Sequence, residues 1–248
     1  MRDLLSWRFK FGVLTPSVNS VVQPEYDDMR LPGITNQIAR MYQEDRPHNS
    51  DADMSVSVRQ IDEELEAATR RIMTCRPDAL ILGISGESIW GPNKHKEIAG
   101  RLAEISGGLP LAQAADAIPA ALKALGVKRR IGVISPYFST GQGYLKAFWD
   151  ALGYESVKAR HINAKSGALI AYATREELNA AIRDVDGPEI EAIVQFGANL
   201  PFGRIAAEAE AWLGKPVIAV NTATYWHALR TNGIHDKLYG FGRLLSEH

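Results

Sequence analysis

The chain has 248 residues, of which 46% are hydrophobic and 23% are charged, enough to bury one large core or two cores of about 120 residues. This composition excludes collagen, a disordered chain and a small disulfide scaffold. The 28 Lys and Arg nearly balance the 29 Asp and Glu, which leaves a formal charge of -1. No net field therefore attracts a nucleic acid or an anionic membrane surface.

Cysteine content and the distribution of apolar residues indicate the environment of the protein. One cysteine cannot form an internal disulfide, and no run approaches the roughly 20 apolar residues of a membrane span or the layout of a signal peptide. We expect a cytoplasmic protein without a membrane or nucleic-acid partner, and homo-oligomerisation stays open. The histidines lack metal-ligand spacing, and Gly141-Gln142-Gly143 lacks the third glycine of a dinucleotide fingerprint, so we expect no metal and no cofactor.

Short apolar runs bounded by turn residues alternate with longer amphipathic stretches, which is typical of a parallel α/β sheet. The runs predict strands at 9–14, 34–42, 79–83, 109–113, 130–135, 156–162, 192–196 and 216–220. Most of these runs are apolar throughout, as expected of strands that are buried on both faces. The amphipathic stretches predict helices at 58–75, 94–105, 115–125, 143–152, 175–184, 204–213 and 222–231.

Three segments of the first half of the chain resemble three segments of the second half, in the same order. The pairs are FGVLTPSVNS with IGVISPYFST, PDALILGISGES with EIEAIVQFGANL, and GLPLAQAADAIPAAL with GKPVIAVNTATYWHAL. Chance explains one such pair easily but explains three in register poorly. We therefore predict an α/β fold of two similar half-domains with parallel sheets, related by a pseudo-two-fold duplication, with the active-site cleft between them.

The repeat also predicts where the half-domains begin and end. We expect residues 1–114 together with 222–248 to form the first half-domain, and residues 115–221 to form the second. Ligands bind at the carboxyl ends of parallel strands, so two such halves place two equivalent sets of loops around one cleft. The four loops are 15–19, 83–88, 135–140 and 197–200.

These loops are rich in Gly, Ser, Thr and Asn beside helix starts, where unpaired backbone N–H groups and the helix dipole favour an anion. A small carboxylate or dicarboxylate is the ligand that we expect. The alternative is that each of these residues only caps a helix or closes a turn. The duplication argues against that alternative for the loops as a group.

Six motifs spread over nearly the whole chain resemble a known family. They are GVLTPSVNSVVQPE, LGISGES, GVISPYFSTGQGYLKAFWDALGYE, the pair Ile162-Asn163, VQFGANL and GFGRLL. Together they resemble the aspartate/glutamate racemase superfamily, and within it the branch of maleate cis-trans isomerase and arylmalonate decarboxylase. The resemblance implies a cofactor-independent reaction, a substrate carboxylate held by loop amides and hydroxyls, and one or two cysteines facing each other across the cleft.

The resemblance also implies positions for the site. The two cysteine positions of the family fall on Gly83 and Gly197, so both thiols are missing, and we expect the only cysteine, Cys75, to be a small buried residue at a helix end. The substrate-binding residues that the motifs predict are Pro16, Asn19, Gly83, Ser85, Tyr137, Asn163, Gly197, Ala198 and Asn199.

Glu87 and Ser85 are the candidates for the chemistry of the missing thiols. A carboxyl group in a dry cleft can serve as general acid or base, although exposed glutamates at helix starts are common. Ser85 lies in the sequence GISGE, one residue short of a nucleophile elbow. We predict Glu87, Ser85 and Tyr137 as catalytic residues, with His161 or a water held by Ser85 as the next candidates.

Two classes of function follow. The first is a cofactor-independent enzyme, a lyase or isomerase similar to the decarboxylase or to maleate isomerase, acting next to a carboxylate of a small organic acid with a non-cysteine acid or base. A hydrolase of a small carboxylate or amide that uses Ser85 and Glu87 is its variant. The second class is a catalytically inactive, carboxylate-binding paralogue. A carboxyl and a hydroxyl gained beside the lost thiol favour the enzyme.

Overall fold

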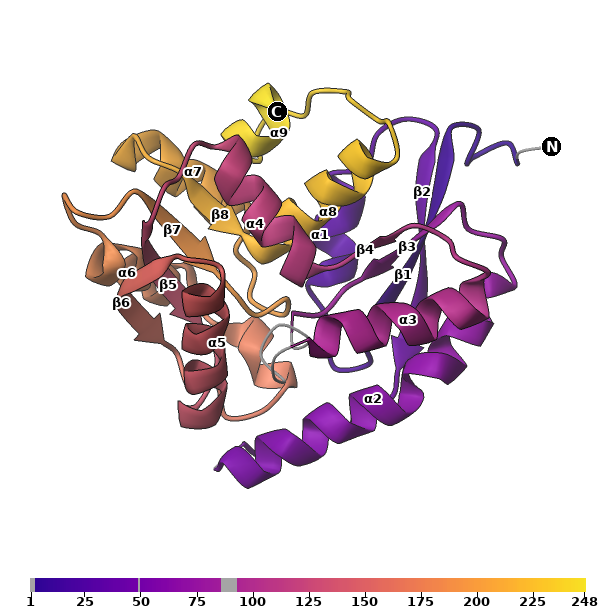
Figure 1. The fold of residues 1–248 in the computed structure, drawn as a ribbon, viewed down its shortest axis with the longest axis horizontal. Helices are drawn as coiled ribbons and strands as arrows, with labels where there is room; N and C mark the ends of the chain where they lie inside the picture. Colours follow the sequence, from indigo (N-terminus) through magenta and orange to yellow (C-terminus); the bar gives the residue numbers. More distant parts are fainter. Residues whose placement is uncertain (1–2, 49, 86–92) are drawn as a thin grey trace.

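Two parallel sheets of four strands each lie side by side and organise the chain (Figure 1). The computed structural model describes residues 3–48, 50–85 and 93–248. The first sheet has the strand order β2-β1-β3-β4 and the second has β6-β5-β7-β8, so each strand of the second sheet takes the place of the strand numbered four lower in the first. The predicted α/β fold of two similar halves with parallel sheets is confirmed.

Each half alternates strands with helices. The strands are β1 (Phe9–Pro16), β2 (Ile34–Met41), β3 (Ala79–Leu82), β4 (Leu111–Ala112), β5 (Arg130–Ser135), β6 (Glu155–His161), β7 (Ala192–Gln195) and β8 (Val217–Ala219). The helices are α1 (Val22–Asp28), α2 (Asp51–Met73), α3 (Lys94–Ser106), α4 (Ala114–Ala124), α5 (Ser139–Ala151), α6 (Arg175–Val185), α7 (Gly203–Leu213), α8 (Val220–Thr231) and α9 (Arg243–Glu247), with a 3₁₀ turn, η2 (Ala168–Tyr172).

All eight predicted strands and all seven predicted helices are present, with their ends displaced by a few residues. The largest difference is in α2, which begins at Asp51 and not at residue 58, because the hydroxyl of Ser50 caps it by accepting the Asp53 N–H at 3.3 Å. The sequence does not predict α1, η2 and α9. These elements have seven, five and five residues, which is too short for a helical period to show.

The sheets repeat each other in register until the strands end. Gly83 N donates to Leu14 O at 2.7 Å, and the corresponding hydrogen bond in the second half runs from Phe196 N to Ile134 O at 2.9 Å. Gly83 therefore corresponds to Phe196, and Gly197 lies one residue further along its loop. The two glycines at the expected thiol positions are not equivalent in the two sheets.

Equivalent glycines in the central strands let a helix approach each sheet. A β-carbon on Gly12 of β1 would lie 2.9 Å from Ile72 Cγ1 of α2, and one on Gly132 of β5 would lie 2.7 Å from Val185 O of α6. Both distances are shorter than real contacts of a β-carbon, so a side chain at either position would push the helix away from the sheet. The duplication thus extends to how α2 and α6 pack.

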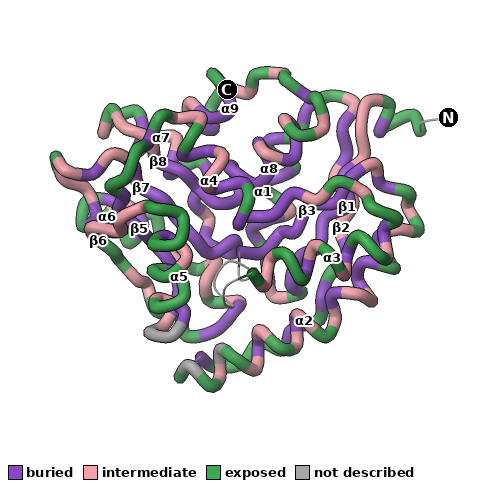
Figure 2. The backbone as a smooth tube through the Cα atoms, in the orientation of Figure 1, coloured by how far each residue is buried: buried purple, intermediate pink, exposed green. Residues whose placement is uncertain are grey.

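One cluster of buried apolar side chains spans both sheets (Figure 2). It contains Phe11 of β1, Ile131 of β5 and Trp149 of α5, together with residues of α4 and α8. Helix α8 packs against α1, which the prediction places in the first half, and against α4, which it places almost wholly in the second. The half-domain boundaries stay a prediction, because this shared cluster runs across them.

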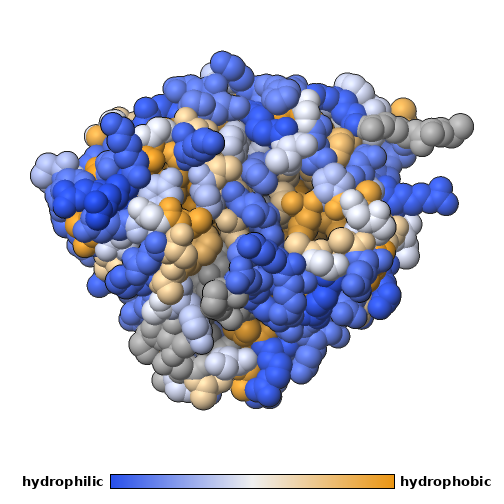
Figure 3. Space-filling view, in the orientation of Figure 1, coloured by the Kyte–Doolittle hydropathy of each residue, from blue (hydrophilic) through white to orange (hydrophobic). Residues whose placement is uncertain are grey.

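On the face seen in Figure 3 the surface is mainly hydrophilic, and hydrophobic residues gather there in separate patches. Among the described residues, no helix combines the length and the apolar character that crossing a membrane requires.

Glu25 of α1 joins the first half to the starts of two later helices. Its Oε1 accepts the N–H of Gly203 at 2.8 Å, and its Oε2 accepts from Asn221 Nδ2 at 2.7 Å. Desolvation raises the pKa of the Glu25 carboxyl, while the hydrogen bonds from Asn221 and Gly203 lower it. An acceptor at these helix starts also interacts favourably with the helix dipoles.

We expect Glu25→Ala to lower the free energy of unfolding by about 1 to 3 kcal/mol, because it leaves these donors without their acceptor. Urea denaturation followed by circular dichroism measures the change. The control is Glu208→Ala, which removes an exposed ion pair with Arg175 and should change stability by no more than about 0.5 kcal/mol. Equal effects of the two substitutions would show that Glu25 does not join the halves.

Candidate active site

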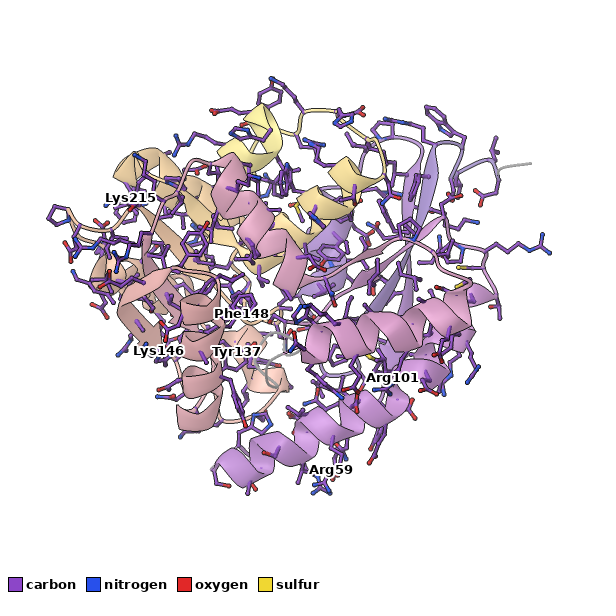
Figure 4. The ribbon with its side chains drawn as sticks, in the orientation of Figure 1. Arg59, Arg101, Tyr137, Lys146, Phe148 and Lys215 are labelled. Atoms are coloured by element: carbon purple, nitrogen blue, oxygen red, sulfur yellow. The ribbon has the colours of Figure 1, made fainter. Side chains whose placement is uncertain are left out.

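A cavity of about 100 Å³ opens where the carboxyl ends of the central strands of both sheets meet. The loops after β1, β3, β5 and β7 contribute to its wall, as do the segment after β2, one face of α2 and the region of η2. In Figure 4, Tyr137 lies where the second half faces the first, near the start of α3. The lining residues are Pro16, Val18, Asn19, Gln43, His48, Ser57, Val58, Ile61, Ile84, Ser85, Tyr137, Gly167, Ile170, Gly197, Ala198 and Asn199.

The hydroxyl of Ser85 is the centre of the polar wall. Ser85 is only 2% exposed, and its Oγ accepts the backbone N–H groups of Gly197 at 3.0 Å and Ala198 at 3.1 Å. The same Oγ lies 3.0 Å from the hydroxyl oxygen of Tyr137. A residue of the first half is thus held by two amides and a phenol of the second half.

The direction of the contact with Tyr137 follows from the capacity of a hydroxyl group. A serine oxygen has two acceptor lone pairs and one proton, and both lone pairs receive N–H groups here. Ser85 therefore donates its proton to the Tyr137 oxygen, and the phenol proton points away from Ser85. Accepting this hydrogen bond makes the phenol a stronger donor.

Asn19 lines the cavity, and the oxygen of its side-chain amide is held by the backbone. Its Oδ1 accepts the backbone N–H groups of Val21 and Val22, each at 2.9 Å, at the start of α1. This pair of contacts fixes which branch of the amide is the oxygen. The Nδ2 group makes no hydrogen bond to another described residue, so it is a second donor available to a ligand.

The side-chain amide of Asn199 joins the loops that surround the cavity. Its Oδ1 accepts the N–H of Ser20 at 3.0 Å, and its Nδ2 donates to Gly167 O at 2.8 Å and to Val18 O at 3.4 Å. These contacts connect the loop after β1 with the loop after β7 and with η2. Asn199 therefore lines the cavity while its amide holds the walls together.

Both expected thiol positions are closed to a side chain. A β-carbon on Gly83 would lie 2.9 Å from Val22 Cγ1 and 3.1 Å from Leu14 O. Gly197 has a φ of +101°, and its β-carbon would lie 2.6 Å from Pro136 Cγ. Residues with a side chain rarely adopt the φ of Gly197. The backbone at both positions therefore leaves no room for a cysteine side chain.

Seven of the nine predicted substrate-binding residues lie together on this cavity. The other two do not line it: Gly83 packs under Val22, and Asn163 is exposed, with its Oδ1 accepting from Gln142 Nε2 at 3.2 Å. Their predicted contacts with substrate, like those of the seven, stay predictions. Glu87 lies outside the described residues.

The sequence did not point to three polar lining residues, Gln43, His48 and Ser57. The first two follow β2, so the rule that ligands bind at the carboxyl ends of strands would have found them if it had been applied to that strand. Ser57 lies on α2, in the turns that the predicted helix omitted. The aliphatic wall, formed by Val18, Val58, Ile61, Ile84 and Ile170, also came only with the structure.

Two other candidates lie away from the cavity. Cys75 is half-buried at the end of α2, before β3 begins and so at the opposite edge of the sheet, and its Sγ donates to Ile72 O at 3.0 Å. His161 at the end of β6 contacts Ser135 Oγ through Nδ1 at 2.7 Å and is not among the lining residues. Within the described part of the chain, no group of His, Cys, Asp and Glu could hold a metal ion.

We expect Gly197→Ala to lower the free energy of unfolding by about 1 to 3 kcal/mol, because the positive φ and the contact with Pro136 both oppose a β-carbon. The matched control is Gly143→Ala in α5, where a β-carbon meets nothing within 4 Å and alanine is the better helix former. Urea denaturation compares the two. A Gly197→Ala variant as stable as Gly143→Ala would show that the loop accepts a side chain.

The chain is similar to known proteins in both sequence and fold. The family model described as arylmalonate decarboxylase matches residues 57–245. Maleate isomerase of Nocardia farcinica is 23% identical over 248 residues, covering 96% of each chain. A mutant of the Nocardia farcinica maleate cis-trans isomerase with a covalently bound succinylcysteine intermediate has a TM-score of 0.85 at 22% identity, covering 97% of this chain and 99% of that one.

Arylmalonate decarboxylase itself has a TM-score of 0.70 at 21% identity, with 96% of this chain and 100% of that chain covered. At such identities the structural likeness shows the fold, whereas the family model covers most of the chain. The chain therefore belongs to the arylmalonate decarboxylase family, a family of cofactor-independent enzymes in the aspartate/glutamate racemase superfamily.

Proposed function

We propose that this enzyme is a cofactor-independent decarboxylase that acts on a small malonate-type acid with an apolar substituent and transfers a proton to the carbon next to the retained carboxylate. The observation that carries the proposal is the division of one cavity into a wall of hydrogen-bond donors around Ser85 and a wall of aliphatic side chains. Family membership supports the same reaction class.

The donor wall suits the retained carboxylate. Tyr137, strengthened by the proton of Ser85, and the Nδ2 group of Asn19 are donors from opposite halves. In decarboxylation the negative charge of the departing group moves onto the α-carbon and the retained carboxylate. Donors fixed before the reaction stabilise that charge without having to reorganise.

The aliphatic wall suits the substituent. A cavity of about 100 Å³ is of the same order as the apolar cavity of about 150 Å³ that takes up benzene in another protein. Aliphatic side chains there also weaken binding of a carboxylate at that end, because a charge next to them loses its hydration. This destabilises the carboxylate that leaves as carbon dioxide, which is uncharged.

Thiol-dependent isomerisation does not fit this cavity. The maleate isomerase relative carries a succinylcysteine intermediate, whereas the only cysteine of this chain, Cys75, lies at the opposite edge of the first sheet. An acid or base can replace a thiol that only donates a proton, but it cannot replace a thiol that adds to a double bond. Decarboxylation is therefore the better proposal of the two.

Hydrolysis through Ser85 is also disfavoured. A serine nucleophile needs a base that takes its proton, and the partners of Ser85 among the described residues are two N–H donors and a phenol. Two N–H groups also withdraw electron density from the oxygen. Ser85 is better suited to bind than to attack.

We expect the enzyme to release carbon dioxide from phenylmalonate or methylmalonate and to form no fumarate from maleate. Proton NMR of the three reaction mixtures, with a carbon dioxide assay, measures both outcomes. Fumarate formation would identify an isomerase that needs no thiol. Binding of the acids without turnover of any would identify the inactive, carboxylate-binding paralogue.

We expect Tyr137→Phe to lower kcat/KM about 10- to 100-fold, through a higher KM and a lower kcat, because a lost charge-assisted hydrogen bond costs about 1.5 to 3 kcal/mol. Tyr144→Phe is the control, since Tyr144 is exposed on α5 and should keep both constants. Steady-state kinetics on the best malonate measures the change. An unchanged kcat/KM in Tyr137→Phe would remove the phenol from the carboxylate site.

Decarboxylation also needs a group that transfers the proton to the α-carbon. Glu87, assigned from the sequence, stays a prediction, and its test is a loss of about 10² to 10⁴ in kcat for Glu87→Gln.

A further inference from the structure

We propose that His48, held by Ser57, is the general acid that delivers the proton to the α-carbon. The inference rests on the proposed decarboxylation and assigns a catalytic group to it. His48 and Ser57 both line the cavity and both are buried, with 7% and 3% of their surfaces exposed. Their side chains meet at 3.0 Å between His48 Nε2 and Ser57 Oγ.

Both halves of the protein hold His48 in place. Its backbone N–H donates to Lys165 O at 2.6 Å, and the neighbouring Pro47 forms an isolated bridge with Ser166. Its ring is held from the other side by Ser57, which stands on α2 of the first half. A group that transfers a proton must keep a fixed position relative to the substrate, and these contacts provide it.

The ring keeps one nitrogen for the reaction. Nε2 faces Ser57, and no described residue hydrogen-bonds Nδ1. In the imidazolium both nitrogens carry a proton, so Nε2 donates to the Ser57 hydroxyl and the Nδ1 proton is the one that can be transferred. Among the described residues that line the cavity, the other side chain that can ionise is Tyr137, whose place on the donor wall suits it to hold the carboxylate.

Decarboxylation breaks one carbon–carbon bond and forms one carbon–hydrogen bond. The bond between the α-carbon and the departing carboxylate breaks, its electron pair stays on the α-carbon and spreads into the retained carboxylate, and carbon dioxide leaves. The imidazolium of His48 gives its proton to the α-carbon and becomes neutral. The ring then takes a proton from water, and the enzyme returns to its starting state.

The surroundings of His48 allow it to change charge during the cycle. Desolvation lowers the pKa of His48, and the charges of Asp45 and Asp53 raise it. Tyr137 shares the cavity, and the loop between β6 and η2 contacts the His48 backbone through the carbonyl of Lys165. A bound dianion raises the pKa of the ring further, because an opposite charge favours the imidazolium. Binding of the substrate therefore favours the protonated form of the His48 ring.

The test compares matched variants of the full chain on phenylmalonate. We expect His48→Gln to lower kcat by about 10² to 10⁴ with little change in KM, and Ser57→Ala to lower it less. His161→Gln is the control, because it breaks a similar contact with Ser135 outside the cavity, and it should keep normal kinetics. Glu87→Gln is measured beside these variants, because the sequence predicts Glu87 for the same proton transfer.

The pH profile separates a catalytic role from a structural one. Since the protonated ring is the active form, kcat should fall as the pH rises through the pKa of His48 in the complex, and that alkaline limb should be absent in His48→Gln. A normal kcat in His48→Gln would overturn the inference. A large loss in Glu87→Gln beside a normal His48→Gln would return the proton transfer to Glu87.

If no malonate is turned over, the proposed decarboxylation is wrong. A binding measurement then still tests the place of His48 in the site. We expect phenylacetate to raise the titration midpoint of the His48 ring nitrogens in NMR spectra while leaving that of His161 unchanged. A His48 midpoint that phenylacetate does not move would overturn the placement of His48 beside the reacting carbon.

Discussion

The hydrogen bonds from the Gly197 and Ala198 amides to the Ser85 hydroxyl are the interaction on which the site depends. They cross from one half of the molecule to the other, they fix the loop after β3 against the loop after β7, and they set the direction of the contact with Tyr137. Without them the two halves would still share a core. The cavity, however, would have no ordered donor wall.

The same interaction accounts for how the site manages without thiols. The backbone of Gly197 turns to a positive φ against Pro136, and in that conformation its N–H points at Ser85. A thiol on this residue would require a different loop. The chain thus has a backbone donor at the position where the resemblance implies a reactive side chain.

The duplication explains the two similar sheets, but the two halves contribute different polar side chains to the cavity. The sheets, their register and the glycines that let α2 and α6 pack are repeated. The polar groups are not repeated, since Ser85 and Asn19 come from the first half while Tyr137 comes from the second. The segment after β2, with Gln43 and His48, gives the first half a further part of the wall.

The sequence alone determined the parallel α/β sheets, their duplication and the family, because buried strands, strand-end loops and repeated motifs are local patterns. It also placed Pro16, Asn19, Ser85, Tyr137 and the loop 197–199 near one cleft. Only the tertiary structure decided that Asn163 lies outside the cavity, that Asn199 joins the walls, and that His48 and Ser57 meet there. These outcomes depend on which side chains from distant segments come within hydrogen-bond distance, and no local pattern encodes that.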